Sequence, residues 1–505
     1  MKQMSALPPV LRTAPLDRPY RQAINSDILR PVSINQTSCK FVFDRVGILD
    51  SNSQLQLAQT VTQNNANSAV NTGAYLPTST GALAMISRCY MTIGGKMISD
   101  LRDLPHFSTY HRLQLSNEYK KGILNPKQGG NDNFQGSIGR RILANGNTAK
   151  RSRGFDEPFG VLSRPSSSYA VSLAQATFGT QLADETNTAE VEKRQLTNDE
   201  NTTPTFSVGL SQLIPFLKAE GGLQLPLGLI KEEVAIVVEF NDGNDFGHRF
   251  CVPTTDKAGN PLLATECTSK IVENKVLMMV DYLFYPEQIL NVAQDMVAKG
   301  GYNVPYSEVL VSESVKTAVN GANTFSFNLS FAGKRVKNMI IQKQLIENVP
   351  ANEVINNIGR YNSLAWKNNE SYNLQINSRN FYSRSISNVG LQKSEADMAS
   401  TAPLQLCGAR YSWNNNWDGA VPNNLLSDRL TNGYANDSEE ASQHWLGIKI
   451  QNFLGQGVRI NNVPMNYTEQ INAVAGDDPL TRRYRFFVET QRVVNLSNGL
   501  VTVIE

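Results

Sequence analysis

The strongest constraint on the fold of this chain is a stretch near its middle, residues 275–309, which reads KVLMMVDYLFYPEQILNVAQDMVAKGGYNVPYSEV. Its first part, Lys275 to Tyr285, has apolar side chains on both alternating faces, and Asp281 is its only charge after Lys275. A strand that is apolar on both faces is typical of one that lies between two layers of structure. We therefore expect a buried β-strand here.

A helix and a new β segment are predicted directly after this strand. Pro286 is tolerated in a first helical turn, Glu287 complements the helix N-terminus, and Gly300-Gly301 ends the helical periodicity. The apolar residues at helical spacing are Ile289, Val292, Ala293, Met296 and Val297. After a short joint, Gly301 to Pro305, residues 324–331 alternate apolar and polar side chains. The stretch thus predicts the end of one β domain, a bracing helix over 286–299, and the opening of a second β domain.

Both halves of the chain contain strand and hairpin patterns in a similar order. In the first half, Gly94-Gly95 predicts a tight turn between two strands, and Leu104 begins a helix with four aromatic or apolar positions. The predicted β segments before the linking stretch are 41–60, 83–98, 169–178, 206–210 and 234–240. Those after it are 324–331, 336–341, 372–382, 404–413, 447–460, 483–495 and 500–504. The repeated order predicts a tandem of two related β-sandwiches.

Length and composition agree with a globular protein of two large β domains. The 505 residues are 40% hydrophobic and 18% charged, and all-β domains commonly reach about 200–250 residues each. The net charge of +2 argues against a protein that chiefly grips nucleic acid. The start of the chain lacks the apolar core of a signal peptide, and no apolar run is long enough for a membrane span. The cysteines, at positions 39, 89, 251, 267 and 407, form no Cys-x-x-Cys pair, which favours buried, reduced thiols in an intracellular protein.

The expected domain boundaries follow from these patterns. Residues 1–36, rich in proline and basic side chains, are predicted to form an N-terminal arm. The arm either drapes over a neighbour or stays disordered, or it contacts an acidic surface such as nucleic acid or anionic lipid. The first β domain is expected over 37–300, with long loops at about 125–205, and the second over 301–505, with a loop at 414–443.

Four blocks of the sequence resemble a known family, the double jelly-roll major capsid proteins of large eukaryotic DNA viruses and their relatives, the virophages and polinton-like viruses. The blocks are YMTIGGKMISDL (90–101), IPF (214–216) with Gly222 and LQLPLGLIKEEVAIVVEF (223–240), VDYLFYPEQILNVAQDMV (280–297), and RVVNLSNGLVTV (492–503). They occur in the family's order and span nearly the whole chain from about residue 38.

The resemblance implies an all-β chain of two tandem eight-stranded jelly-roll sandwiches with short bracing helices and long loops. It implies a major capsid protein whose homotrimers form pseudo-hexagonal capsomers and tile an icosahedral shell in the virion, assembled inside the host cell. The implied partners are other copies of the chain, minor capsid and penton proteins, and an internal membrane or the genome through the arm. No enzyme activity, cofactor or small-molecule substrate is implied.

The residues themselves predict no catalytic, cofactor-binding or metal-binding site. His106 and His111 are five residues apart, which does not place two ligands on one helical face, and the other histidines are His248 and His444. The carboxylates that could pair in a cleft, as in jelly-roll glycosidases, are Glu232, Glu233, Glu239, Asp281 and Glu489. Solvated strand faces and inter-subunit salt bridges are the favoured roles for them.

Three other functions stay open from the sequence. The tryptophans at 366, 413, 417 and 445 would suggest sugar stacking if they were exposed, although buried anchoring or subunit contact is favoured. A β-sandwich carbohydrate-active enzyme would need a carboxylate such as Glu239 or Asp281 facing a cleft. A double jelly-roll scaffold protein, of the poxvirus type, would share the fold but be absent from the mature virion. A vertex or fibre protein would more often have one jelly roll, which the second domain's strands argue against.

Overall fold

The computed structural model describes residues 23–63, 74–75, 80–113, 125–128, 138–142, 148–152, 195–196, 203, 205–218, 225–241, 267–299, 301–345, 371–382, 385–387, 446–451, 456–473 and 481–504. Several predictions fall on other residues: the strands 169–178 and 404–413, the loop 414–443, most of the loop 125–205, and the four tryptophans all lie outside the described residues.

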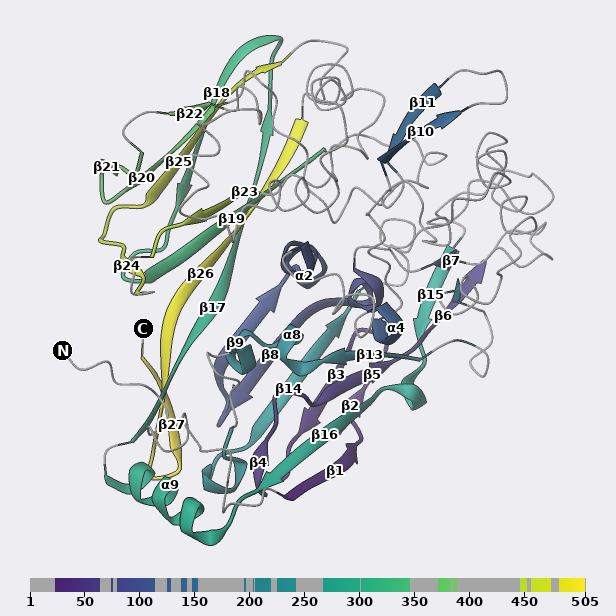
Figure 1. Ribbon diagram of the computed structural model, residues 1–505, viewed down its shortest axis with the longest axis vertical. Helices are drawn as coiled ribbons and strands as arrows, with labels where there is room; N and C mark the ends of the chain where they lie inside the picture. Colours follow the sequence, from purple (N-terminus) through teal and green to yellow (C-terminus); the bar gives the residue numbers. More distant parts are fainter. Residues whose placement is uncertain are drawn as a thin grey trace.

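The first half of the chain forms a sandwich of two antiparallel sheets, called here the first sandwich (Figure 1). One sheet has the order β1 (Ala23–Leu29), β16 (Leu277–Phe284), β5 (Gln54–Leu57) and β13 (Phe206–Gly209), with β4 (Ile48–Leu49) beside β16. The facing sheet has the order β2 (Ser33–Ile34), β3 (Ser38–Val42), β14 (Val234–Phe240), β8 (Ile86–Ile93) and β9 (Lys96–Arg102). Three short pairs accompany them: β6 (Gln59–Gln63) with β15 (Cys267–Ile271), β7 (Ala74–Tyr75) with β12 (Gln195–Leu196), and β10 (Ile138–Ile142) with β11 (Thr148–Ser152).

The second half of the chain forms the second sandwich. Its larger sheet has the order β17 (Tyr302–Thr317), β26 (Thr481–Ser497), β19 (Arg335–Leu345) and β23 (Leu446–Lys449), with β27 (Leu500–Ile504) beside β26 and β24 (Val458–Arg459) beside β19. The facing sheet has the order β18 (Gly321–Leu329), β25 (Met465–Ala473), β20 (Ser371–Ile376) and β21 (Arg379–Asn380), with β22 (Ile386–Ser387) also beside β20.

The two sandwiches share one topology. The first contains, in chain order, β1, β3, β5, β8, β9, β13, β14 and β16, and the second contains β17, β18, β19, β20, β21 with β22, β23, β25 and β26. In each set the first, last, third and sixth strands form one sheet, and the second, seventh, fourth and fifth form the other. Each sandwich therefore has eight strand positions, and the predicted tandem of related sandwiches is confirmed.

Short helices lie between and beside the strands, as predicted. The bracing helix is α9 (Glu287–Lys299), which begins one residue after the proline that was expected to open it. The predicted helix at Leu104 is α2 (Leu104–Leu113). The remaining described helical turns are α4 (Asn125–Gln128), α8 (Leu210–Leu213), η1 (Gly81–Met85), η4 (Pro215–Lys218), η5 (Leu227–Leu229) and η8 (Glu273–Lys275).

Three predictions about strands and boundaries are corrected by the structure. Residues 23–29 of the expected arm form β1, which pairs with β16 as the first strand of the first sandwich. The expected joint Gly301–Pro305 is largely the start of β17, where Pro305 is tolerated because β17 lies at the edge of its sheet. Finally, β16 is less buried on its second face than expected: Met278, Val280 and Tyr282 lie in the core, whereas on the other face Leu277, Met279 and Asp281 are partly exposed and Leu283 is fully buried.

A salt bridge crosses the core of the second sandwich. Lys343 on β19 and Glu469 on β25 belong to facing sheets, and their Nζ and Oε1 atoms lie 2.7 Å apart with both side chains fully buried. Around them the core is aromatic, with Phe325, Phe327, Tyr467, Tyr484 and Phe486 packed ring against ring. The pair links the two sheets through the core, and loss of either charge would leave the other buried without a partner.

Removing one partner of this pair should destabilise the fold strongly. We expect Lys343→Met to lower the free energy of unfolding by about 3–5 kcal/mol, because it leaves the Glu469 carboxylate buried without its cation. The double variant Lys343→Met/Glu469→Leu should recover most of that loss. Lys40→Met, which breaks the exposed Lys40–Glu233 pair, should cost less than about 1 kcal/mol. Chemical denaturation measures all three, and equal losses for Lys343→Met and Lys40→Met would contradict this account.

Candidate functional site

The two sandwiches are joined through one long antiparallel ribbon, β17 with β26, which pairs from Tyr302 with Leu496 to Thr317 with Thr481. Alternate residues of the ribbon belong to different cores. Phe486 and Val488 lie in the core of the second sandwich, whereas Phe487 between them lies in the core of the first. In the same way, Leu310 packs against the second core while Val309 lies in the first. The contact of this ribbon with the first sandwich is called here the inter-sandwich interface.

Aromatic side chains fill the interface. The rings of Phe107 on α2 and Phe487 on β26 have centroids 5.5 Å apart. Phe216 on η4 and Tyr306 on β17 meet edge to face at 5.0 Å, and the Tyr306 hydroxyl donates a hydrogen bond to the carbonyl of Ile98 on β9. The hydroxyl is thus satisfied inside an apolar contact, as buried tyrosines require.

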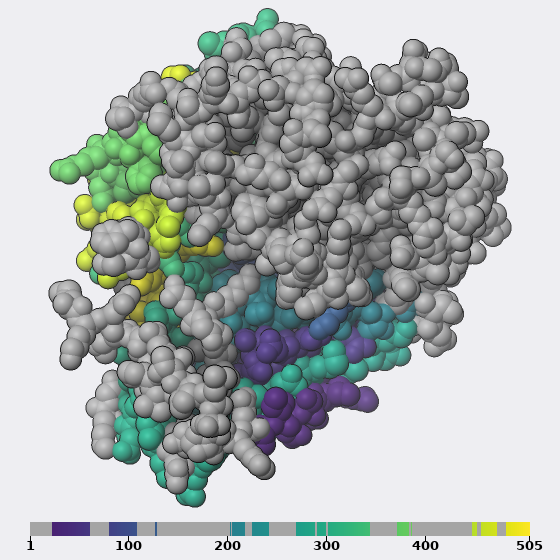
Figure 2. All heavy atoms as spheres, viewed as in Figure 1, coloured from purple at the N-terminus to yellow at the C-terminus, as the bar shows by residue number. Residues whose placement is uncertain are grey.

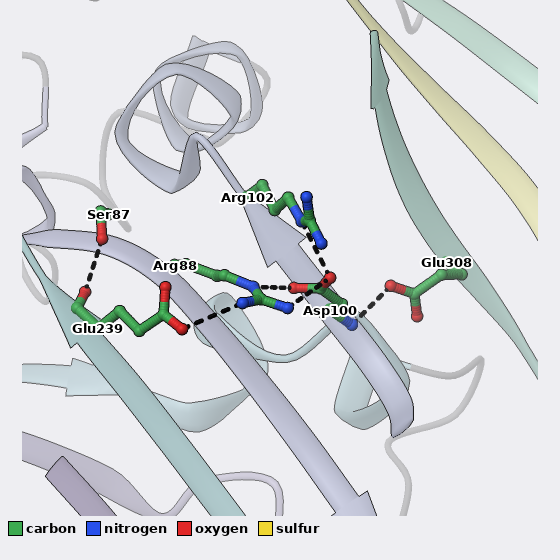
Figure 3. Close-up of polar contacts among 6 residues, drawn as sticks. All are labelled: Ser87, Arg88, Asp100, Arg102, Glu239 and Glu308. Atoms are coloured by element: carbon green, nitrogen blue, oxygen red, sulfur yellow. Dashed lines mark hydrogen bonds and ion pairs between the residues drawn. The ribbon is translucent and has the colours of Figure 1, made fainter. Parts of the chain in front are cut away.

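A network of charged side chains lies where β8, β9 and β14 meet Glu308 of β17 (Figure 3). The Arg88 guanidinium on β8 binds both carboxylate oxygens of Asp100 on β9, at 2.6 and 3.0 Å, and reaches Glu239 on β14 at 3.0 Å. Arg102 donates to Asp100 from the other side at 3.1 Å. Paired carboxylates raise the pKa of Arg88, chiefly through the hydrogen bond with Asp100. The network ties three strands of the first sandwich together at the edge that faces β17.

Glu308 on β17 connects this network to the second sandwich. Its Oε1 accepts a 2.7 Å hydrogen bond from the backbone N–H of Asp100, and its side chain is bonded to Ser99. Glu308 is only 1% exposed, and its Oε2 has no partner within the described residues. Burial raises the pKa of Glu308 to about 7, against the opposing effects of those hydrogen bonds and of Arg492. A carboxyl that titrates near neutral pH therefore lies at the contact between the sandwiches.

A second polar contact lies further along the ribbon. Arg485 on β26 is nearly buried, and its Nε lies 3.2 Å from Glu313 on β17 and 3.8 Å from Asp103, which follows β9. Burial disfavours the charged form of both groups, which raises the pKa of Asp103 and lowers that of Arg485. The opposite charge of the partner counteracts this effect in each case. Nearby, Gln342 Nε2 and His106 Nδ1 share a 3.0 Å hydrogen bond between β19 and α2.

The C-terminal strand is attached to the β8–β9 turn of the first sandwich. Lys96 Nζ donates to the carbonyl of Val501 at 2.7 Å, and the N–H of Val501 donates to Glu232 at 2.8 Å. Gly94, in the turn, has φ +58°, and a Cβ there would overlap the Glu232 carboxylate. The predicted glycine turn is therefore required by its backbone conformation, while the Glu232 carboxylate lies at the end of a flexible side chain.

Helix α9 braces the lower end of the same interface. The carbonyl of Val297 accepts a 3.2 Å hydrogen bond from Asn498, in the turn between β26 and β27. Gly301 links α9 to β17 with φ +79°, and a Cβ there would overlap the side chain of Asn495. The turn from helix to ribbon is thus specified by one glycine.

The structure does not bring the five candidate carboxylates together in one cleft. Each has its own partner: Glu232 has Lys96, Glu233 has Lys40, Glu239 has Arg88, Asp281 has Ser26 and Glu489 has Asn338. They serve strand pairing and the interface within the chain. Whether any of them also forms a salt bridge between subunits stays a prediction.

The other candidate residues divide between described and undescribed parts. His106 contacts the interface, His111 lies on α2, and His248 and His444 fall outside the described residues. Cys39 and Cys89 are buried free thiols, and burial raises the pKa of Cys39 to about 12 and raises that of Cys89 as well. Within the described ranges, no three His, Cys, Asp or Glu residues are placed to hold a metal ion. None of the described helices is long and apolar enough to cross a membrane.

Comparison with known proteins gives matches in structure but not in sequence. No family model and no curated protein sequence matches the chain. Among solved structures, a chain of the Sputnik virophage structure is 12% identical with a TM-score of 0.55, over 95% of this chain and 88% of that one. The Faustovirus major capsid protein is 10% identical with a TM-score of 0.51, over 96% and 92% of the two chains. A chain of the PBCV-1 virus capsid is 10% identical with a TM-score of 0.50, over 98% and 99%.

The chain is a double jelly roll. Its first and second sandwiches are the two jelly rolls, and the match extends over both of them and the linking helix. At about a tenth identity, the likeness establishes the fold of this double jelly roll. The fold class predicted from the four sequence blocks is thereby confirmed.

The interface residues of the double jelly roll were not found from the sequence. Val304, Tyr306 and Glu308 alternate along one strand and therefore share one face. A charged residue that continues a row of apolar residues is a sequence signal that could have identified Glu308. Asp100 and Arg88 gave no such signal, because their pairing depends on the β8–β9 register. Lys343 lies just beyond the predicted strand 336–341, whereas β19 extends to Leu345 and includes it.

The raised pKa of Glu308 predicts a pH-dependent stability. The folded chain holds this proton more tightly than the unfolded chain, whose glutamate has the ordinary pKa of 4.5. The contribution to stability is therefore full below 4.5 and is lost as the pH rises through about 7. We expect wild-type protein to lose up to about 3 kcal/mol of unfolding free energy between about pH 5 and about pH 8 through this group.

Glu308→Gln should remove this part of the pH dependence, because the amide stays neutral and can still accept from the Asp100 N–H. Glu313→Gln on the same strand, where the side chain is partly exposed, is the control and should keep the wild-type slope. Denaturation curves across that pH range measure the slope. An unchanged slope in Glu308→Gln would show that Glu308 is not the titrating group.

Proposed function

We propose that this chain is a major capsid protein, and that its homotrimers form the pseudo-hexagonal capsomers of an icosahedral virus shell. The observation that carries the proposal is the extent of the structural likeness. Capsid chains from PBCV-1 and Faustovirus match at least 96% of this chain and at least 92% of their own length. A shared fold over both jelly rolls and their linkage supports a shared structural role more strongly than a match of a single sandwich would.

The repeated topology supplies the physical reason for such an assembly. Each chain carries two sandwiches with the same strand order, so a ring of three chains presents six similar corners. Such a ring can pack in near-hexagonal arrays through a few repeated contacts. The inter-sandwich interface, with its aromatic contacts and the Glu308–Asp100 hydrogen bond, holds the two corners of one chain in a fixed relation.

Further partners belong to the same proposal. Minor capsid and penton proteins would complete the shell, in the virion and after assembly inside the host cell. Since residues 23–29 form β1, the arm that ties neighbouring capsomers together or contacts a membrane or the genome would be residues 1–22. Loops at 125–205 and 414–443 would lie at the outer surface or between subunits.

Electron microscopy of the purified recombinant protein tests the proposal. We expect class averages with threefold symmetry and a six-cornered outline, because each chain contributes two similar sandwiches. Particles with two corners only would contradict the capsomer. If six-cornered particles form but purified virions lack the chain, the scaffold alternative is correct instead. Shells formed without residues 1–22 would contradict the role given to the arm.

A further inference from the structure

One sheet face of the first sandwich carries large exposed apolar side chains at its β1 edge. It is the outer face of the sheet β1-β16-β5-β13, turned away from the core. Its residues, by alternation and register, are Ile24, Ser26, Ile28, Ile48, Leu277, Met279, Asp281, Leu283, Gln54, Gln56, Ser207 and Gly209, of which Leu283 is fully buried. Ile24 and Ile28 are 63% and 61% exposed, although β1 is fully paired with β16. Figure 2 shows β1, in purple, at the surface beside the teal β16.

The one charged side chain on this face has a hydrogen-bond partner on the same face. Asp281 is its single ionisable side chain, and it accepts a 2.6 Å hydrogen bond from the Ser26 hydroxyl on the neighbouring strand. Everything else on the face is aliphatic, amide, hydroxyl or glycine. A face of this kind can lose its water at little electrostatic cost, as the central part of a protein interface does.

The equivalent face of the second sandwich is covered. It belongs to the sheet β17-β26-β19-β23, which has the same strand order. Val309, Ile340 and Phe487 point away from the second core and are buried in the first, where Phe487 meets Phe107. The same surface of the jelly roll is therefore buried in one copy within the chain, whereas in the other copy its β1 edge is exposed.

The second sandwich packs against a surface of the first sandwich. The equivalent surface of the second sandwich is exposed. In the first sandwich this surface includes the β8–β9 hairpin, where the carbonyl of Ile98, the third residue after the Gly94-Gly95 turn, accepts a hydrogen bond from the Tyr306 hydroxyl on β17. In the second sandwich the matching hairpin is β20–β21, and its turn is Asn377-Ser378, both with positive φ. Phe381 is the third residue after that turn and is 38% exposed.

We propose that the outer face of β1 and β16 in one copy packs against the β20–β21 hairpin of a second copy. Each sandwich has one such sheet face and one such hairpin. Within the chain, the face of the second sandwich packs against the hairpin of the first. The remaining face and hairpin lie on different sandwiches, so their contact is head to tail and can close into a ring of chains. This inference rests on the proposed function, for which it names the contact between neighbouring chains.

Two sets of variants test the contact from both sides. Ile24→Asp/Ile28→Asp places charge on the face, and Phe381→Asp places it on the hairpin. Val319→Asp is the matched control, since Val319 is 67% exposed in the turn between β17 and β18, away from both surfaces. Ile24, Ile28 and Val319 are 63%, 61% and 67% exposed, so their variants should keep the wild-type unfolding temperature, and every variant should keep the wild-type circular dichroism spectrum. Sedimentation velocity then reports association.

We expect the face and hairpin variants to be monomers, with association weakened at least about 100-fold, while Val319→Asp associates like wild type. Mixing the two monomeric variants should give a species of two chains but no larger ring. The intact hairpin of the face variant can accept the intact face of the hairpin variant, whereas the reverse contact is blocked on both sides. Only a head-to-tail contact between these two surfaces predicts that rescue.

The possible results distinguish failure of the proposed contact between chains from failure of the proposed capsomer. If wild-type protein is monomeric under all conditions, the capsomer and this contact are both overturned. If wild type associates and the face and hairpin variants associate equally well, the contact alone is overturned. If both variants are monomeric and their mixture stays monomeric, the two surfaces do not pair with each other, and the contact is again overturned.

Discussion

The fold of this chain depends on a single ribbon, β17 paired with β26, that contributes to two cores at once. In most sandwiches, one face of each sheet packs inward and the other meets water. Here successive residues such as Phe486 and Phe487 are buried in different sandwiches, so neither sandwich can move without disturbing the other's packing. This shared packing joins two similar β domains into one unit. Helix α9 and Gly301 connect the first sandwich to the start of the ribbon.

The polar groups at the interface make that union specific. Apolar contacts such as Phe107 with Phe487 provide stability but tolerate small shifts. The hydrogen bonds of Glu308 and Tyr306 to backbone groups of β9 do not, since each would leave a buried polar atom unpaired if the strands slipped. The cost is a buried carboxyl with a raised pKa. On the exposed face of β1 and β16 the polar groups of Ser26 and Asp281 are hydrogen-bonded to each other, which suits a contact that forms between chains after folding.

The sequence predicted those parts of the fold that have local signals. The alternation before Phe240, the Gly94-Gly95 turn and the Pro286 helix start all depend on neighbouring residues, and the structure has each of them. Strand β1 was missed because its isoleucines face outward while Asn25 and Asp27 face the core side, the reverse of the usual pattern. The interface was missed because the pairing of Glu308 with Asp100 joins residues far apart in sequence, and no local pattern encodes that register.

The central claim is that the shared ribbon makes one rigid chain with two equivalent sandwiches, suited to assembly in threes. Light scattering of the wild-type protein over a range of concentration and salt tests it most directly. The account predicts a species with three times the 55.8 kDa mass of the chain, unchanged on dilution and little affected by salt, because the exposed face has one compensated charge. A stable monomer across that range would contradict it.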